Sequence, residues 1–521
     1  MRRAVTSSAL ALAFAASSLP QAPSSPSQAI LGYHQVRLDA SGGLLPWFAD
    51  DPAASYDHVI GLVWQFWHQM RRCGNGVPYY LQHQVWKPDR DDPRGLGGDQ
   101  ISMALSSWNR LHAYTGDEAI VADMRLMADH WLETGLTPSS AAWPWLPYPY
   151  NLEVHSGRYD GDMRAGPGVI QPDKAASFGA ELVTLYEVTN ARKYLTAARR
   201  IADTLARHVT VGSASISPWP FRVDAATGDL ARPRPEFAKD GNNVNANQLW
   251  TAYTSNWTDA LRLFEELSAL GLGTPEYARA RIITRAWIDA YPLRTNNWGP
   301  FFEDIVEYSN TAINADTMAQ YLLERPTVDR RSLRQARSTL DWVERTFSNH
   351  RYQALGVEPI NEQTVYQQPG NSHTARHAAV ELLYAEKSGD WSRKRAQVQR
   401  LNWATYMVDT DGKNRYPGDD IWLTDGYGDY VRHYLRAMAA SPDLAPADQN
   451  HLLRTTSVIQ TIQYGAERIT YTKFDPRSIE MLKLGAWTPG RVAGGVLHWS
   501  PATHVAHIRA VGRTVTIERA R

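Results

Sequence analysis

Apolar side chains recur every three or four residues along most of the chain, between about residues 55 and 441. This spacing is typical of amphipathic helices that bury one face in a core. The predicted helices form pairs joined by short turns, and these pairs are 99–114 with 118–133, 174–188 with 193–208, 245–270 with 275–291, 314–324 with 331–347, and 371–387 with 391–406. Helices at 55–72 and 426–440 have no partner adjacent in sequence, so they would form a sixth hairpin if the array closes into a ring.

Short and long connections alternate along this helical array. Thr115-Gly116-Asp117 is a short turn inside a pair, whereas the connections between pairs hold most of the clustered Trp, Tyr, Asn and acidic residues. Hairpins place all the long connections at one end, beside the N-termini of the inner helices, whose free N–H groups favour anionic ligands. We therefore expect the functional site at that end. An open α-solenoid is the alternative to a closed ring, although such long connections would be unusual in one.

The pattern changes after residue 441. Alternating apolar and polar positions, rich in β-branched residues, predict strands at 457–464, 469–474, 495–499, 505–510 and 514–518. We interpret residues 442–521 as a small antiparallel β-rich region appended to an all-α domain at 55–441. A structural role is expected for it rather than that of an independent sugar-binding module.

The N-terminus has the parts of an export signal. Arg2 and Arg3 precede an Ala- and Leu-rich stretch at 5–19, and Ser27-Gln28-Ala29 matches a small-x-small cleavage site. The sequence thus predicts a signal peptide over 1–29, an N-terminal extension over 30–54 and a periplasmic or secreted protein; a merely disordered N-terminus is the alternative. No later stretch is long and apolar enough to span a bilayer, and the lone Cys73 excludes an internal disulfide framework.

The balance of charges limits the classes of partner. Lys+Arg and Asp+Glu both number 54, so the formal net charge is zero. Nucleic-acid-binding proteins usually carry a basic excess, so no nucleic-acid partner is expected. A balanced total can still contain a local basic patch, which leaves an anionic polymer open as a ligand. The sequence leaves the oligomeric state open.

The helical hairpins, with long aromatic- and acid-rich loops before the inner helices, resemble the six-hairpin glycosidase superfamily and related polysaccharide lyases. The resemblance covers residues 55–441 and implies an (α/α)6 toroid with carbohydrate-active function. It rests on architecture and loop content and indicates no particular family, so no catalytic residue is assigned by correspondence.

Aromatic and polar residues of the long loops are the expected contacts of an oligo- or polysaccharide. Prolines interleave with four aromatic residues in one loop, which stiffens the chain while the rings project from it. The alternative is that these rings only pack the loop onto the barrel. The predicted substrate-binding residues are Trp143, Trp145, Tyr148, Tyr150, Asp162, Arg164, Trp219, Arg222, Glu236, Trp298, Asn371, Trp422 and Tyr427.

Paired carboxyl groups make glycoside hydrolysis the favoured reaction, because it needs one protonated and one ionised carboxyl group. Glu303 follows Phe301 and Phe302, an apolar setting that would raise its pKa toward that of a general acid. Asp425, in the sixth long loop, is the expected base that activates water. The neighbours Asp304 and Asp429 are further catalytic candidates, and Asp99, Asp162 and Glu236 are held in reserve.

A polysaccharide lyase or uronate epimerase is the rival interpretation. Either would need groups that neutralise a sugar carboxylate and a Tyr or His near the reacting carbon; candidates for these roles are His373, Tyr366, Asn371, Arg164, Arg222 and Arg376. A non-catalytic glycan-binding protein is a third interpretation. His373 and His377 lie four apart on one helical face, but no HExxH pattern accompanies them, so neither a metal nor another cofactor is expected.

Overall fold

The computed structural model describes residues 29–70, 72–82, 96–153, 156–234, 251–302, 308–325, 328–414, 417 and 429–521. Predictions that fall on other residues, including the signal peptide up to residue 28, lie outside this part of the chain.

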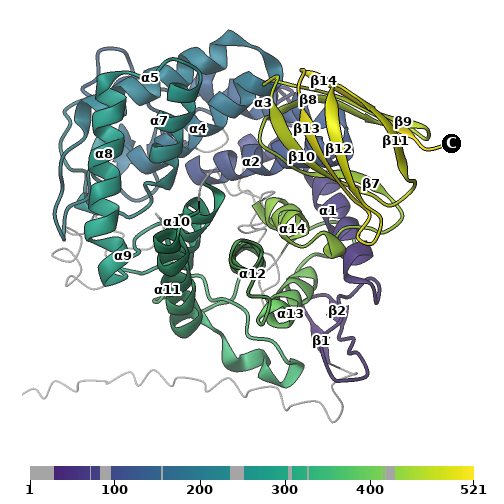
Figure 1. Ribbon diagram of the computed structural model, residues 1–521. Helices are drawn as coiled ribbons and strands as arrows, with labels where there is room; N and C mark the ends of the chain where they lie inside the picture. The colour runs from purple at the N-terminus through teal and green to yellow at the C-terminus, as the bar shows by residue number, and fades with distance from the viewer. Residues whose placement is uncertain are drawn as a thin grey trace, which may run out of the picture.

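The described helices form two concentric layers (Figure 1). Each inner helix packs against the next, and the last returns to the first, which closes the ring. The inner helices are α2 (Gly98–Thr115), α4 (Pro172–Thr189), α7 (Thr258–Ala269), α10 (Ala312–Glu324), α12 (Asn371–Ser388) and α14 (Asp429–Ala440). The outer helices are α1 (Pro52–His68), α3 (Glu118–Thr134), α5 (Arg192–His208), α8 (Pro275–Ala290), α11 (Arg330–Phe347) and α13 (Lys394–Thr405), with the short α9 (Pro292–Thr295) after α8.

The sequence explains which helices are inner. Helix α4 is buried without interruption from Pro172 to Leu185, whereas α5 buries only one face, which includes Tyr194, Ile201 and Leu205. A helix of the outer layer keeps a solvated side, and one of the inner layer packs all around. The predicted closed array of hairpins, with α1 beside α14, is therefore the observed arrangement of the described helices.

One predicted helix is shorter than expected. Helix α7 begins at Thr258, and residues 253–257 are not helical, so the prediction of an unbroken helix over 245–270 is wrong. The Trp257 backbone N–H donates to the Ser255 carbonyl (2.9 Å) and its indole Nε1–H donates to the Thr254 carbonyl (2.7 Å). These bonds fold a tight turn that competes with the helix.

The C-terminal region is a sandwich of two four-stranded antiparallel sheets, ordered β12-β13-β10-β7 and β11-β14-β9-β8. Its strands are β7 (Asn450–Thr455), β8 (Ile459–Tyr464), β9 (Arg468–Lys473), β10 (Ser478–Leu484), β11 (Pro489–Ala493), β12 (Gly495–Ser500), β13 (Val505–Ala510) and β14 (Thr514–Arg519). The predicted antiparallel β region is confirmed, but the pattern missed β7, β10 and β11. Strand β10 is buried almost throughout, including Glu480 and Lys483, so it has no alternation to detect.

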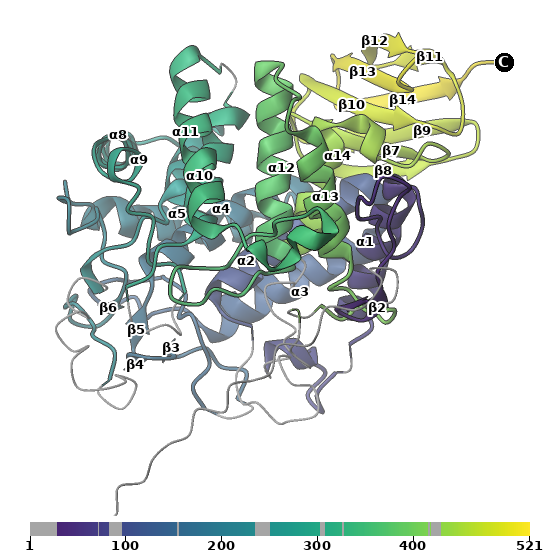
Figure 2. The ribbon, with the colours of Figure 1, turned by 90° about the horizontal axis from the view of Figure 1, so that it is seen from below.

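The sandwich sits at one side of the ring and contacts α2, α4 and α14 through β7 and β8 (Figure 2). The α2–α3 turn takes part in this contact. Gly116 ends α2 at φ 75°, and a Cβ at that position would lie 2.6 Å from the Ile462 carbonyl oxygen. Glycine is thus required both by the left-handed backbone and by the close approach.

An N-terminal segment bridges the outer layer where the ring closes. It contains the small hairpin of β1 (Ile30–Leu31) and β2 (His34–Gln35) and runs along α13 before entering α1. The Leu44 N–H donates to Gln399 (2.6 Å), Asn402 donates to the Leu44 carbonyl (2.7 Å), and the Tyr406 hydroxyl donates to the Leu45 carbonyl (2.8 Å). These contacts hold α13 against the start of α1.

The remaining short elements lie in the connections. They are the 3₁₀ turns η2 (Tyr79–Leu81), η4 (His350–Leu355) and η5 (Pro442–Leu444), and the strand pairs β3 (Gly161–Asp162) with β4 (Gly166–Pro167) and β5 (Val169–Ile170) with β6 (Val223–Asp224). Among the described helices, none combines the length and the apolarity that crossing a bilayer requires.

Candidate functional site

The inner helices enclose a cavity of about 510 Å³ along the axis of the ring. Its wall extends from Asp99 in the first turn of α2 to Arg110 near the end of that helix. Each inner helix packs against its outer partner and two neighbours, so the remaining stripe faces the axis. Hydroxyl and amide groups occupy much of this stripe, among them Ser102, Ser106, Ser177, Thr184 and Gln320, and Asn256 adds an amide just before α7.

Charged side chains complete the wall. The carboxylates are Asp99, Glu181, Asp259, Glu265 and Glu324, and the guanidinium groups are Arg110, Arg262, Arg325, Arg376, Arg432 and Arg436. Such a wall suits a ligand with many hydroxyl groups, because each polar group of the ligand can replace the water that it loses.

Solvent reaches the two ends of the cavity to different extents. Asp99 and Asn256, near the N-termini of the inner helices, are only 9 % and 7 % exposed. At the other end 33 % of the Arg110 side chain and 42 % of the Glu324 side chain are exposed. In the described part of the chain, the more accessible wall is therefore the one near the C-termini of α2 and α10.

Arg262 gathers three carboxylates on the α7 side of the cavity. Its guanidinium donates to Asp259 (2.9 Å), Glu181 (3.1 Å) and Glu266 (3.2 Å). Burial would raise the pKa of Asp259, but the Arg262 charge outweighs it and lowers that pKa. For Glu266 burial dominates and raises the pKa to about 7. One carboxyl group here is thus fixed as an anion while another can exchange a proton near neutrality.

Asp429, a predicted catalytic residue, lies in a second charged cluster between α12 and α14. It accepts a hydrogen bond from Arg376 (2.8 Å) and bonds to Ser372 and Arg432. Burial opposes its charge, yet Arg376 and Arg432 hold the pKa of Asp429 well below its usual range. An anion held this way cannot donate a proton near neutral pH and is a weak base, so its contacts suit a group that positions the arginines.

The Phe301 ring lines the cavity two residues before Glu303, the predicted general acid. Lys174 holds this ring in place: its Nζ donates to the Phe301 carbonyl (3.0 Å) and lies 3.4 Å from the ring centroid. The Lys174 ammonium is also 3.4 Å from the Asp173 carboxylate, which accepts from Asn256 (2.9 Å). The described chain therefore brings the fourth long loop to the cavity wall.

Several other predicted site residues lie outside the described part of the chain, so the structure says nothing of their geometry. They are Glu236, Glu303, Asp304, Trp422, Asp425 and Tyr427.

The described aromatic candidates do not line the cavity. Trp143, Tyr150, Trp219 and Trp298 are buried, and the Trp219 indole N–H donates to the Leu205 carbonyl (2.8 Å). Such contacts match the alternative in which the rings pack the loops onto the barrel.

Trp145 and Tyr148 are only partly buried. The Arg200 guanidinium lies 4.2 Å from the centroid of the Trp145 ring. This contact is on the outer side, where Arg200 lines a second cavity together with α3 residues such as Leu132 and Glu133. A role in substrate binding stays a prediction for both rings.

Asp162, Arg164 and Arg222 meet one another rather than the cavity. Asp162 is fully buried and accepts from Arg222 Nε (3.0 Å), the Arg164 N–H (2.7 Å) and the Gln171 amide (2.5 Å). An acceptor with this many partners fixes the loop around β3 and β4.

Asn371 and His373, in the first turn of α12, are also buried. Asn371 donates to the Asn414 side chain (2.9 Å), and the His373 ring lies 5.9 Å from the Phe302 ring. His373 is thus close to the loop that carries Glu303, whereas Asn371 joins the fifth long loop to the sixth.

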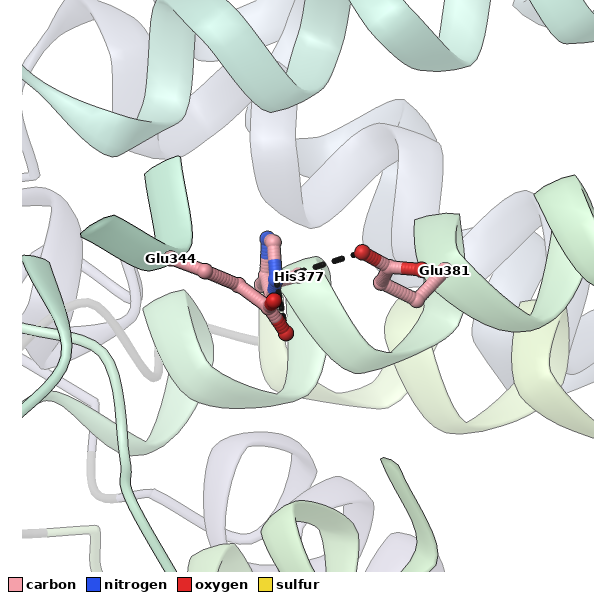
Figure 3. Close-up of side chains that lie close together, drawn as sticks. All are labelled: Glu344, His377 and Glu381. Carbon is pink, nitrogen blue, oxygen red and sulfur yellow. Dashed lines mark ion pairs between the residues drawn. The ribbon is translucent and has the colours of Figure 1, made fainter. Parts of the chain in front are cut away.

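Glu344, His377 and Glu381 are close enough to be compared with a metal site (Figure 3). However, Arg400 donates to Glu344 (2.6 Å) and Arg337 donates to Glu381 (2.8 Å). Burial alone would lower the pKa of His377, but Asp316, whose Oδ1 is 3.0 Å from Nδ1, raises it to about 9. A protonated imidazole and two guanidinium groups oppose a cation, so these contacts describe an ion-pair network.

Most of the charged residues of the cavity wall lie on the inner helices, so the composition of the long loops does not predict them. Arg432 and Arg436 lie four residues apart on a helix that is otherwise largely buried, and Arg262 is similarly placed on α7. Charged residues repeated on one face of an otherwise apolar inner helix were the available signal. The sequence alone indicates Arg376 only as a partner for a sugar carboxylate.

Known proteins resemble this chain in structure but not in sequence. No family model matches the sequence, and no curated protein matches it. A sugar epimerase from a ruminal bacterium is similar in structure, with a TM-score of 0.53, 12 % identity, and coverage of 75 % of this chain and 98 % of that one. Cellobiose 2-epimerase from Bacillus thermoamylovorans B4167 has a TM-score of 0.52 and 14 % identity, with coverage of 75 % of this chain and 99 % of that one. The enzyme of the same name from Spirochaeta thermophila DSM 6192 has a TM-score of 0.51 and 12 % identity, with coverage of 75 % and 96 %. The resemblance to (α/α)6 toroid enzymes is confirmed as one of fold, without a specific family.

Proposed function

We propose that this chain is a carbohydrate-active enzyme that holds an oligosaccharide, or one end of a polysaccharide, in the axial cavity. The observation that carries the proposal is the cavity itself: about 510 Å³ of space walled by hydroxyl, amide, carboxylate and guanidinium groups. This volume lies in the range of small-molecule sites, while the wall is more polar than in most of them. Phe301 and Tyr321 are the aromatic residues of the described wall.

The proposed reaction is hydrolysis of a glycosidic bond. Glu303 would act as the general acid and Asp425 as the base, and Phe301 supports the first assignment because it brings that loop to the cavity. Elimination or epimerisation of a uronic acid is the rival reaction. It would draw on Arg376 and His373, which the structure places in the first two turns of α12.

Product analysis separates these reactions. The purified protein is incubated with neutral and uronate-containing oligosaccharides, and new reducing ends, the ultraviolet absorbance of unsaturated uronates and the proton NMR spectrum of the sugars are recorded. Hydrolysis yields reducing ends without the absorbance, elimination yields both, and epimerisation yields a new sugar configuration alone.

Matched variants test the assigned roles. Glu303→Gln and Asp425→Asn should each lower turnover by about a hundredfold to ten-thousandfold, the usual contribution of a general acid or base, and leave saccharide binding in place. Asp411→Asn is the control, because among the described residues this exposed loop carboxylate pairs with Lys413 (2.6 Å) and Asp411 itself does not line the cavity. Equal losses in all three variants would contradict the assignment, and binding without turnover of any substrate would favour a glycan-binding protein.

A further inference from the structure

Three arginines form what we call the basic wall of the cavity: Arg110 on α2 and Arg432 and Arg436 on α14. Helix α14 packs directly against α2, so the three side chains line neighbouring parts of the same surface. Arg432 and Arg436 are one helical turn apart and therefore share a face of α14.

Two described acidic groups lie within 4 Å of the guanidinium groups of the basic wall or of the neighbouring Arg376. Glu324 is 3.8 Å from Arg110, too far for a hydrogen bond and with 42 % of its side chain exposed. Asp429 bonds to Arg432 but is shared with Arg376, which also lines the cavity. Within 4 Å these four guanidinium groups meet two described carboxylates, Glu324 and Asp429, while Glu181 and Asp259 act on Arg110 and Arg432 from farther away.

Arg436 has the least support of the four. Within the described residues no hydrogen bond or ion pair reaches it, and its Nε is buried without a partner. Burial and the nearby Arg110 charge lower the pKa of Arg436 well below its ordinary value, and the Glu324 charge offsets only part of this effect. A guanidinium in such a place raises the free energy of the empty fold unless an anion joins it.

We infer that the basic wall binds an anionic substituent, a carboxylate or a sulfate, on the saccharide that occupies the cavity. This inference rests on the proposed function and narrows the substrate class to acidic sugars. Planar guanidinium groups match both anions, because each offers two parallel N–H donors to two oxygens. Ser106, Asn109 and Gln320 lie on the same cavity surface and suit the hydroxyl groups of the rest of the sugar.

Binding of matched oligosaccharides tests this inference. Calorimetry on the whole protein compares an oligouronate, a sulfated oligosaccharide and a neutral oligosaccharide of equal length. At least one acidic sugar should bind roughly ten- to a hundredfold more tightly than the neutral one, as expected for charge-assisted hydrogen bonds. Arg436→Gln should weaken the binding of the acidic sugar about tenfold more than that of the neutral sugar, so that most of this preference is lost.

Controls keep the outcome interpretable. Arg436→Lys retains the positive charge but loses the two parallel N–H donors of the guanidinium, so it should recover part of the preference for the acidic sugar. Arg519 is an exposed arginine on the sandwich, and Arg519→Gln should leave the affinities for all three sugars unchanged. Should Arg436→Gln fail to fold, the wild-type preference must still weaken as salt increases. Binding or turnover of neutral sugars without any acidic preference would overturn this inference alone, whereas no binding of any saccharide would overturn the proposed function itself.

Discussion

Two consecutive residues of α12 belong to two very different charged clusters. Arg376 points toward α14, where it bonds to Asp429 and lines the axial cavity. His377 points toward α10 and α11, where it bonds to Asp316 and lies 3.6 Å from Glu344. The first cluster is part of the cavity wall, and the second lies between α10, α11, α12 and α13, where none of its residues lines that cavity.

The clusters differ in how completely their charges are matched. Around His377 the acids Asp316, Asp341, Glu344 and Glu381 meet the cations Arg337, His377, Arg393 and Arg400. On the cavity side Arg110, Arg376, Arg432 and Arg436 have only Glu324 and Asp429 within 4 Å among the described carboxylates. Buried charge that is matched inside the fold contributes to the folded state, whereas unmatched charge at a cavity wall is available to a ligand.

Breaking the matched cluster should have the largest effect. Arg337→Ala leaves Glu381, which is 2 % exposed, without its paired guanidinium, and we expect the free energy of unfolding to fall by about 3 to 5 kcal/mol. Urea denaturation measures this loss. Arg393→Ala is the matched control, since Arg393 contacts the same acids but is 42 % exposed, and it should cost no more than about 1 kcal/mol. Similar losses in both variants would show that the cluster is not a buried network.

The same cluster predicts an alkaline loss of stability. The pKa of His377 is raised to about 9 in the folded protein, above the ordinary value of 6.5, so its contribution is complete below pH 6.5 and is lost as the pH rises through 9. The loss should reach at most about 3 kcal/mol, measured as the free energy of unfolding of the wild type relative to His377→Gln.

Asp429 should give the opposite pH dependence of stability. Its pKa is lowered in the folded protein, so its contribution is lost at acidic pH instead. Asp429→Asn should therefore alter the acidic limb of the stability profile and leave the alkaline limb in place. An unchanged alkaline limb in His377→Gln would contradict the assignment to His377.

The smallest expected effect is a change in saccharide affinity when Glu324, beside the basic wall, loses its charge. Glu324→Gln removes an acid that lies 3.8 Å from Arg110 in the basic wall, so acidic saccharides should bind about two- to fivefold more tightly, a gain typical of a partly exposed charge. Calorimetry with acidic and neutral oligosaccharides measures it, and Glu276→Gln, exposed in the first turn of α8, is the control. Weaker binding of the acidic sugar would mean that Glu324 itself contacts the ligand.

Much of the fold could be predicted from local patterns. Turn residues such as Gly116 and Asn190 mark hairpins whose helices bury regular apolar faces, and the pairing follows from the short turns. Strand β10 could not be found this way, because Glu480 and Lys483 are buried by tertiary contacts that no local pattern records. The non-helical conformation of residues 253–257 could not be predicted for a related reason, since Trp257 donates hydrogen bonds to its own neighbours instead of continuing a helix.

The candidate site was less predictable than the fold. The sequence predicts aromatic residues of the long loops as saccharide contacts, yet Trp219 and Trp298 are buried. The cavity wall depends on where Arg110 and Arg436 meet in space, from helices that are more than 300 residues apart in the sequence. Spacing along one helix shows that charges share a face, but only ring closure shows that two such faces meet.

The N-terminal segment that crosses from α13 to α1 also bears on how the ring assembles. Its hydrogen bonds to Gln399, Asn402 and Tyr406 join residues 355 to 361 positions apart. Contacts at such separation form late, because the entropy of closing a long loop must be lost before they contribute. During synthesis the hairpins can fold one after another, but the ring has its complete axial cavity only when the chain beyond α13 is available to meet its own beginning.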